Sequence, residues 1–274
     1  MSAHPQRIAH ASTPSDAGRA SDLSLVMPCY NEDAVVGYTI PRLVGAFEKA
    51  GYVLELIAVD NGSSDRTGEI IQALATQHRA VVPTRVDQNK GYGNGVLSGI
   101  PLCTAPWVGI IPADGQVDAE DVVRLYEAVV VTNRQVLGKA RRRFRMDGLR
   151  RKVVSVLYNL LVRALWPTLS SLDVNGLPKI LPRDAILAME LKSQGWVLDL
   201  EIMIKAHHAR LRVLEVNVFA RMRGSGVSHV RLDTVREFLW KLVVFRLSPS
   251  WRRDLKRMRS RAADLAGSPS RRSS

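Results

Sequence analysis

The sequence predicts an α/β protein with a mostly parallel sheet flanked by helices. From residue 23 to residue 131, short apolar runs alternate with segments whose apolar residues recur at helical spacing. A polar turn follows several of these runs, and the hydrophobic fraction of 46% suits a folded core. Alternation of this kind predicts parallel strands joined by right-handed crossovers.

The expected elements follow one another in a regular order. The apolar run at 23–27 is halted by Pro28 and is expected to be a buried strand. Helical spacing predicts a helix over 34–50, which Gly51 ends. The same criteria predict strands at 54–59, 80–86 and 107–111, and helices at 69–78, 96–102 and 121–131.

The second half of the chain is less regular. Leu137 opens a strand-like stretch that leads into a basic run at 139–152. Two amphipathic helices are expected at 153–166 and 234–247, and each is shorter than the roughly 18 apolar residues that a membrane-spanning helix needs. Such helices can lie in the interface of a bilayer instead.

Composition narrows the classes of partner and compartment. The formal net charge of +13 favours an anionic partner, such as nucleic acid, a phosphorylated substrate or an anionic membrane. Aromatic residues make up only 6% and do not alternate with the basic run, which disfavours nucleic acid. The two cysteines, Cys29 and Cys103, form no CxxC pair, so a reducing compartment is expected.

The turns after the predicted strands carry the residues with chemical potential. Ligands of parallel sheets bind beyond the carboxyl ends of the strands, so these turns are expected to converge on one crevice. In "VDNGSSDRT", Asp60 can accept hydrogen bonds from a ribose or a base, and Gly62 lets a ligand approach the backbone. Alternatively, Asp65 and Thr67 cap the next helix.

Two further motifs are suited to phosphates and metal ions. "NKGYGNG" offers flexible backbone amides and the ammonium of Lys90, either to cradle phosphates or simply to enter a helix. In "PADGQ", Asp114 and Gln116 are two oxygen ligands for Mg²⁺ or Mn²⁺, whose coordination substrate phosphates would complete. The alternative for this motif is a turn that ends the strand.

In this order and near these separations, "MPCYNE", "VDNGSSDRT", "NKGYGNG" and "PADGQ" resemble the family-2 glycosyltransferases of GT-A fold. The likeness is greatest to the dolichol- and polyprenyl-phosphate sugar synthases and covers roughly residues 24–228. It implies a nucleotide-binding parallel sheet with a smaller acceptor half. It also implies a donor-binding set made up of Pro28, Tyr30, Glu32, Asp60, Gly62, Ser63, Lys90, Gly91 and Ser228.

The resemblance makes Asp114 and Gln116 the metal ligands, with Asp114 also catalytic. The family has a first acid where this chain has Pro112, and proline cannot ligate a metal. Three alternatives follow: weaker metal affinity, Asp114 acting almost alone with diphosphate oxygens, or a cation-independent variant based on Lys or Arg.

The acceptor half is implied by three later segments. Residues 173–184 look like the acceptor-side segment, and "GWVLDLEIMIKA" resembles a stretch that ends in an acidic pair, here Asp199 and Glu201. Either acid could deprotonate an acceptor, orient it or balance charge, and Asp199 could instead cap a helix. Arg223, in "RMRGSGVSH", would stabilise the leaving diphosphate, or it belongs to an exposed basic turn.

The basic run at 139–152 has two readings. In isolation it is a solvated charged loop, and beside an apolar helix it is a surface for lipid headgroups. The family usually has glycine-serine-arginine here, where this chain has Gly138, Lys139 and Ala140. Arg141 or Arg142 would then bind the acceptor phosphate.

Together these features predict an inverting glycosyltransferase that moves a sugar from a nucleotide diphosphate sugar to a polyprenyl phosphate. It would act at the cytoplasmic membrane face as a peripheral protein, with a membrane protein or a second copy as further partners. The alternatives are a soluble small-molecule or protein acceptor, or a catalytically weak nucleotide-sugar binder.

The expected division of the chain has four parts. A disordered leader is expected at 1–22, which lacks the apolar core of a secretory signal, and the GT-A glycosyltransferase domain at 23–230. An amphipathic C-terminal helix region is expected at 231–258 and a disordered tail at 259–274.

Overall fold

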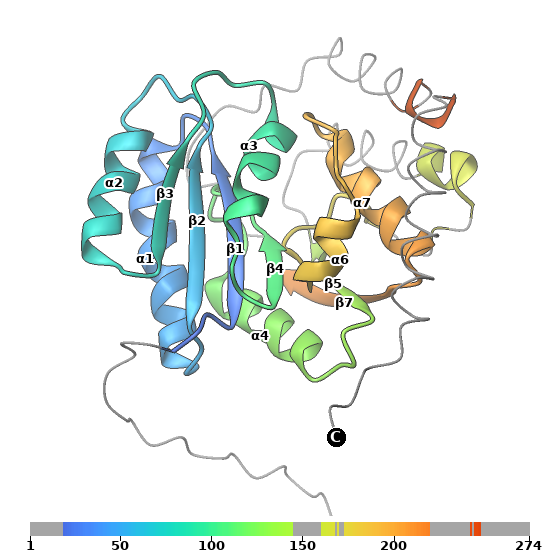
Figure 1. Cartoon of the computed structure of the whole chain (residues 1–274), viewed down its shortest axis with the longest axis horizontal. Helices are drawn as coiled ribbons and strands as arrows, with labels where there is room; N and C mark the ends of the chain where they lie inside the picture. The colour runs from blue at the N-terminus through green and yellow to red at the C-terminus, as the bar shows by residue number, and fades with distance from the viewer. Residues whose placement is uncertain are drawn as a thin grey trace, which may run out of the picture.

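The computed structural model describes residues 19–144, 160–167, 169, 173–219, 242 and 244–247. Its framework is a seven-stranded sheet in the order β3-β2-β1-β4-β6-β5-β7. Figure 1 shows β3, β2, β1 and β4 side by side. The strands are β1 (Leu23–Cys29), β2 (Leu54–Asp60), β3 (Val81–Arg85), β4 (Trp107–Ile110), β5 (Val136–Phe144), β6 (Lys179–Pro182) and β7 (Arg212–Phe219).

The sheet is parallel except at one strand. β1 pairs in parallel with β2 and β4, β2 with β3, and β5 with β7. β6 alone among these seven strands runs the other way, between β4 and β5. The predicted fold class is therefore confirmed. Because β6 is reversed, its first residue, Lys179, pairs with Ile110 at the carboxyl end of β4.

Helices cover both faces of the sheet (Figure 1). One apolar cluster joins the sheet to α1, α2 and α4, and the other joins it to α3, α6 and α7. Burial on both faces explains why the central strands read as continuous apolar runs. The helices are α1 (Asp33–Lys49), α2 (Thr67–Gln77), α3 (Tyr92–Gly99), α4 (Ala119–Val130), α6 (Arg183–Ala188) and α7 (Val197–His208), with a 3₁₀ turn at Ile100–Leu102.

Most predicted elements lie within two residues of their observed bounds, but the helix expected at 96–102 was placed wrongly. α3 begins at Tyr92, inside the glycine-rich motif, and only a 3₁₀ turn covers Ile100–Leu102. Gly91, with φ of 111°, is the N-cap residue and lets the chain turn sharply into the helix. Tertiary packing described below overrides the low helix propensity of the glycines.

The reading of the basic run as a solvated loop is also wrong for its first part. β5 extends to Phe144, and the side chain of Lys139 is fully buried in it. Arg141 is half-buried and its Nε lies 4.0 Å from Glu215 Oε2. Residues 145–152, and the side chain of Arg142, lie outside the described part of the chain.

The domain limits proposed from the sequence are only partly visible. Arg19 and Asp22 form an ion pair of 3.3 Å next to β1, while residues 1–18 lie outside the description. Of the two predicted amphipathic helices, residues 160–166, 242 and 244–247 are described, and all except Trp166 are helical. The tail at 259–274 lies outside. Among the described residues, no helix has the length and apolar content to cross a membrane.

Substitution of Phe47 tests the packing of α1 on the sheet. Phe47 is fully buried, and its ring centroid lies 6.1 Å from that of Tyr126 on α4. Phe47→Ala is expected to lower the free energy of unfolding by about 3–5 kcal/mol in urea denaturation, because it leaves a cavity. Val131→Ala, at a residue that is 83% exposed, should change it by less than about 0.5 kcal/mol. Equal effects of the two substitutions would contradict this packing.

Candidate active site

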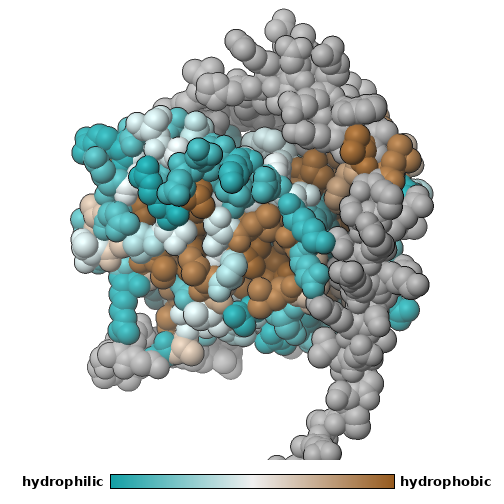
Figure 2. Space-filling model, turned by 45° about the horizontal axis from the view of Figure 1, so that its top comes forward, coloured by the Kyte–Doolittle hydropathy of each residue, from teal (hydrophilic) through white to brown (hydrophobic). Residues whose placement is uncertain are grey.

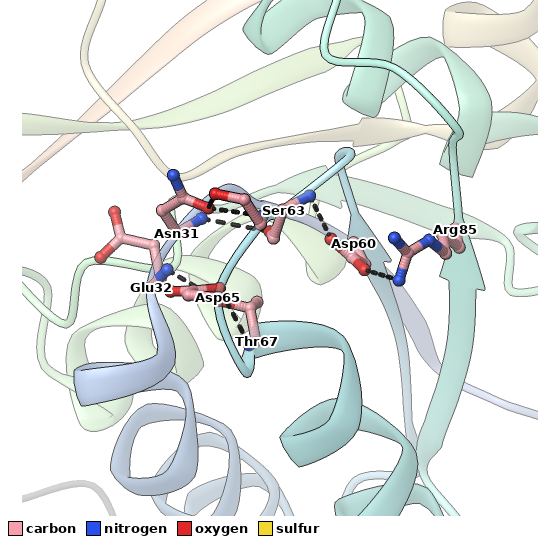
Figure 3. A network of polar contacts seen from close by, with 8 residues as sticks. Asn31, Glu32, Asp60, Ser63, Asp65, Thr67 and Arg85 are labelled. Carbon is pink, nitrogen blue, oxygen red and sulfur yellow. Dashed lines mark hydrogen bonds and ion pairs between the residues drawn. The ribbon is translucent and has the colours of Figure 1, made fainter.

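The turns after β1 and β2 are bonded to each other at the carboxyl edge of the sheet (Figure 3). The Asn31 N–H donates to Ser63 Oγ at 3.1 Å, and the Ser64 N–H donates to Asn31 Oδ1 at 3.0 Å. Asn31 has a positive φ of 52°, which asparagine tolerates better than most residues. The two turns therefore form one unit.

Asp65 and Thr67 join the starts of two helices, a fuller role than the capping alternative proposed from the sequence. The N–H groups of Asp33 and Thr67, the first residues of α1 and α2, donate to the Asp65 carboxylate at 3.2 and 3.0 Å. The Glu32 N–H donates to Thr67 Oγ1 at 2.9 Å. Desolvation acts to raise the pKa of Asp65, but the hydrogen bonds from Thr67 and Asp33 outweigh it and lower the pKa.

Asp60 is buried at the end of β2. Its Oδ1 accepts the Ser63 N–H at 2.9 Å, and its Oδ2 lies 3.0 Å from Arg85 Nη1 at the end of β3 (Figure 3). The carboxylate thus shapes its own turn and fixes the mostly exposed Arg85 beside it. A ligand at this edge would meet the Asp60–Arg85 pair rather than an isolated acid.

The glycine-rich loop packs directly on the Asp60 turn. A Cβ on Gly62 would lie 2.7 Å from the Asn89 nitrogen, so only glycine permits this approach. Asn61 Nδ2 donates to the Gly91 carbonyl at 3.1 Å, and the Gly91 N–H donates to Asn89 Oδ1 at 2.7 Å. Lys90 lies exposed on the same loop, where its ammonium is accessible to an anion.

The other side of the glycine-rich loop contacts the turn before α7. A Cβ on Gly91 would lie 2.7 Å from the Gln194 oxygen, and one on Gly93 would lie 2.2 Å from the Ser193 oxygen. The Asn94 N–H donates to the Gln194 oxygen at 2.9 Å. Gly91, Gly93 and the Asn94 N–H therefore allow two segments that are far apart in the sequence to pack directly on each other.

Glu201 holds that turn in place. Its buried carboxylate accepts the Ser193 N–H at 2.8 Å and lies 2.6 Å from Lys205 Nζ, one helical turn along α7. Lys205 Nζ also donates to the Glu190 carbonyl at 3.0 Å. The geometry favours a positioning role for Glu201 over direct attack on a substrate.

Asp199 is paired with Lys179, the first residue of β6. Lys179 Nζ lies 2.5 Å from Asp199 Oδ1, and both side chains are almost completely buried. Trp196, not Asp199, occupies the N-cap position of α7, so the helix-cap alternative for Asp199 is wrong. Burial, and then the charge of Asp199, raise the pKa of Tyr92 well above its usual value.

A second buried lysine lies beside this pair. Lys139 of β5 is the cross-strand partner of Lys179. Lys139 Nζ donates to the Asp173 carbonyl, and it lies 3.4 Å from Glu215 Oε1 on β7. Burial, and then repulsion by Lys179, lower the pKa of Lys139 to about 8. The acceptor-side segment at 173–184 is thus anchored through its backbone to a buried ammonium.

Asp114 and Gln116 lie in the turn after β4. The Gln116 N–H donates to Asp114 Oδ1 at 3.1 Å, and both residues are half-buried. A Cβ on Gly115 would lie 3.1 Å from Thr39 Oγ1, which places the turn against α1. Within the described residues, no group of three or more His, Cys, Asp or Glu side chains could hold a metal ion. The donor set fits a cation only if substrate oxygens complete its coordination.

The remaining predicted residues divide into two groups. Pro28 lies beneath α3, and the side chain of Tyr30 is 47% exposed at the end of β1. Arg223 and Ser228 lie outside the described residues. Sequence reasoning missed Asn31, Lys179 and Trp196, and of these only Asn31 has a local signal, since its motif "YNE" follows a strand.

Comparisons with known proteins agree with this arrangement. The model of the family described as "Glycosyl transferase family 2" matches residues 24–177. An uncharacterized glycosyltransferase of Mycobacterium bovis is 30% identical over 210 residues, which cover 76% of this chain and 89% of that protein. An undecaprenyl-phosphate 4-deoxy-4-formamido-L-arabinose transferase of Pectobacterium carotovorum is 30% identical over 143 residues, which cover 52% of this chain but only 43% of that relative.

The fold is also found among solved structures. The glucosyl-3-phosphoglycerate synthase of Mycobacterium tuberculosis, in complex with Mn²⁺, UDP and phosphoglyceric acid, superposes with a TM-score of 0.66 at 21% identity. The match covers 82% of this chain and 78% of that one. The chain belongs to glycosyl transferase family 2 and has the GT-A fold.

Substitution of Gly93 tests the contact between the glycine-rich loop and the turn before α7. Gly93→Ala should push the Ser193 carbonyl away and lower the free energy of unfolding by about 1–3 kcal/mol in urea denaturation. Gly195→Ala is the matched control, because its Cβ would meet nothing within 4 Å. If both variants were as stable as the wild type, the two segments would not be in contact.

The buried Lys139 should make stability depend on pH in a defined direction. Its pKa is about 8 in the folded protein and near 10.5 when unfolded, so between these values the unfolded state binds more protons. The free energy of unfolding of the wild type should therefore rise with pH there, by up to about 3 kcal/mol relative to Lys139→Met. Urea denaturation over this pH range measures the difference. As a control, the free energy of unfolding of Lys90→Met, at an exposed lysine, should change with pH as that of the wild type does. If the free energy of Lys139→Met also changed with pH as that of the wild type does, the prediction would be refuted.

Proposed function

We propose that the protein transfers a sugar, with inversion, from a nucleotide diphosphate sugar to a polyprenyl phosphate at the cytoplasmic face of a membrane. The observation that carries the proposal is the bonding of the β1, β2 and β3 turns into one rim. The Asp114 turn follows β4 at the same edge of the sheet and packs against α1. A donor at this edge would meet backbone amides, Lys90 and Arg85 together, which suits an anionic nucleotide.

The donor would be held mainly by the turns after the first three strands. Pro28, Tyr30 and Glu32 would line the nucleotide pocket, with the Asp60–Arg85 pair at the base or ribose. Gly62, Ser63, Lys90 and Gly91 would lie along the sugar and diphosphate. Arg223 and Ser228, outside the described residues, would add contacts to the leaving diphosphate.

Asp114 and Gln116 would hold a divalent cation together with diphosphate oxygens. Such a cation, Mg²⁺ or Mn²⁺, would offset the negative charge that grows on the leaving group. Because position 112 is a proline and not an acid, the substrate would have to supply more of the oxygen ligands than in a site with two acids. Structural neighbours of the chain contain Mn²⁺ or Mg²⁺ with UDP, which supports this part of the proposal.

The acceptor would attack the anomeric carbon from the side opposite the leaving diphosphate. A phosphate acceptor is already ionised and needs little help from a base. Asp199, held by Lys179, would orient the acceptor or balance its charge, and Glu201 would keep the rim in position. The in-line arrangement of the two substrates would account for inversion.

A polyprenyl phosphate is favoured as the acceptor by two observations. The arabinose transferase relative carries undecaprenyl phosphate in its name. In addition, the helical residues Leu160, Val244 and Leu247 expose apolar side chains, beside Arg246. Figure 2, in which the carboxyl edge of the sheet is turned forward, has apolar areas adjoining hydrophilic ones on this face. A lipid with an anionic head would match both kinds of surface.

A soluble acceptor is the second candidate. Glucosyl-3-phosphoglycerate synthase, which shares the fold, was solved with phosphoglyceric acid. A third candidate, a nucleotide-sugar binder with little turnover, is motivated by Pro112.

Substitution of Asp114 tests the donor site. Asp114→Asn should reduce sugar transfer at least about 100-fold and remove the metal-dependent part of the thermal stabilisation by nucleotide diphosphates. Asp118→Asn is the control, since Asp118 lies in the same turn but its Oδ1 is 3.7 Å from Arg42. Wild-type transfer and metal response in Asp114→Asn would contradict the proposed site.

Assays with a short polyprenyl phosphate and with 3-phosphoglycerate would separate the first two candidate functions. Tight nucleotide binding without either product would favour the third.

A further inference from the structure

Trp196 presents an aromatic face at the rim of the candidate site. Its side chain is 57% exposed although tryptophan is usually well buried. Its ring is stacked on that of Tyr92, with centroids 5.1 Å apart and planes at 9°. One face of the indole is therefore covered by Tyr92, and the exposed surface includes the opposite side.

Contacts on both sides fix this pair of rings in place. Tyr92 is the first residue of α3, and its hydroxyl oxygen is buried within the protein. Trp196 follows the turn that Glu201 anchors and that packs on Gly91 and Gly93. Stacking on Tyr92 thus restricts the indole before any ligand arrives, so a ligand that stacks on it would lose less entropy in ordering it.

The Tyr92–Trp196 ring pair lies next to the segments expected to bind the donor. Tyr92 directly follows Gly91 of the glycine-rich loop, and Asp199 lies one helical turn after Trp196 on α7. A group on the exposed face of Trp196 would lie next to the glycine-rich loop expected to hold the diphosphate, because the indole stacks on the residue that directly follows Gly91.

The chemistry of that location favours a sugar ring. One face of a pyranose carries C–H groups, which pack against a flat aromatic surface while the hydroxyl groups point outward to polar partners. We propose that Trp196, supported by Tyr92, binds the sugar ring of the nucleotide sugar and so helps to select the sugar that is transferred. This inference rests on the proposed function and assigns Trp196 as a specificity-determining residue.

Binding of nucleotides with and without a sugar tests the inference on the full-length protein. Isothermal titration would compare UDP with UDP-glucose and GDP with GDP-mannose, to find a pair that the wild type binds. Trp196→Ala should weaken binding of the nucleotide sugar about tenfold while leaving that of the bare nucleotide unchanged. Trp196→Phe should restore most of the loss, because an aromatic face remains. Leu187→Ala, at a residue that is 40% exposed on α6, is the control and should change neither.

The possible results separate the inference from the proposed function. If Trp196→Ala binds both ligands as the wild type does, or loses affinity for both equally, the sugar does not stack on Trp196. A higher KM for the acceptor alone would also overturn the inference, since the indole would then serve the acceptor. If the wild type binds none of the nucleotides, the proposed function fails and the inference fails with it, and this result is seen before any variant is made.

Discussion

Close contact between backbones at the carboxyl edge of the sheet is the constraint on which the candidate site depends. Gly62 allows the β2 turn to touch the glycine-rich loop, and Gly91 and Gly93 allow that loop to touch the turn before α7. Three segments, near residues 62, 91 and 194, are thereby joined without intervening side chains. The glycines commonly associated with phosphate binding in such loops here also have a packing function, so their identity is fixed by the protein as well as by a ligand.

Buried ion pairs fix α7 in a similar way. Lys179 with Asp199 ties α7 to β6. Lys205 and Glu201 pair within α7 and bond to the preceding turn through the Glu190 carbonyl and the Ser193 N–H. Buried pairs of this kind add little net stability, but removal of one partner leaves an uncompensated charge. The pairs therefore favour the arrangement of α7 in which each buried charge keeps its partner. The two acids that the sequence singled out as catalytic candidates are therefore also residues on which the geometry of the rim depends.

The sequence was sufficient where structure is determined locally. The starts of β1 and β2 and the extent of α1 followed from apolar runs and from Gly51. The expected stop at Pro28 was wrong, because β1 continues through it to Cys29, beyond the last residue, Val26, that pairs with β4. Contacts between distant segments limited the rest. α3 begins four residues earlier than predicted because Ser193 and Gln194 support its glycines. Likewise, Lys139 looked solvated within a basic run because its partners, Asp173 and Glu215, lie on other segments.

The reversed direction of β6 bears on how relatives of this protein can diversify. β5 ends, and β6 begins, at the same edge of the sheet as the candidate site. The chain therefore leaves the sheet at Phe144 and re-enters it at Lys179, both at the edge of the candidate site. Under the proposed function, changes next to these two strand ends would alter the surroundings of the donor without disturbing any strand pairing, so new acceptors would be accommodated while the nucleotide half stays the same.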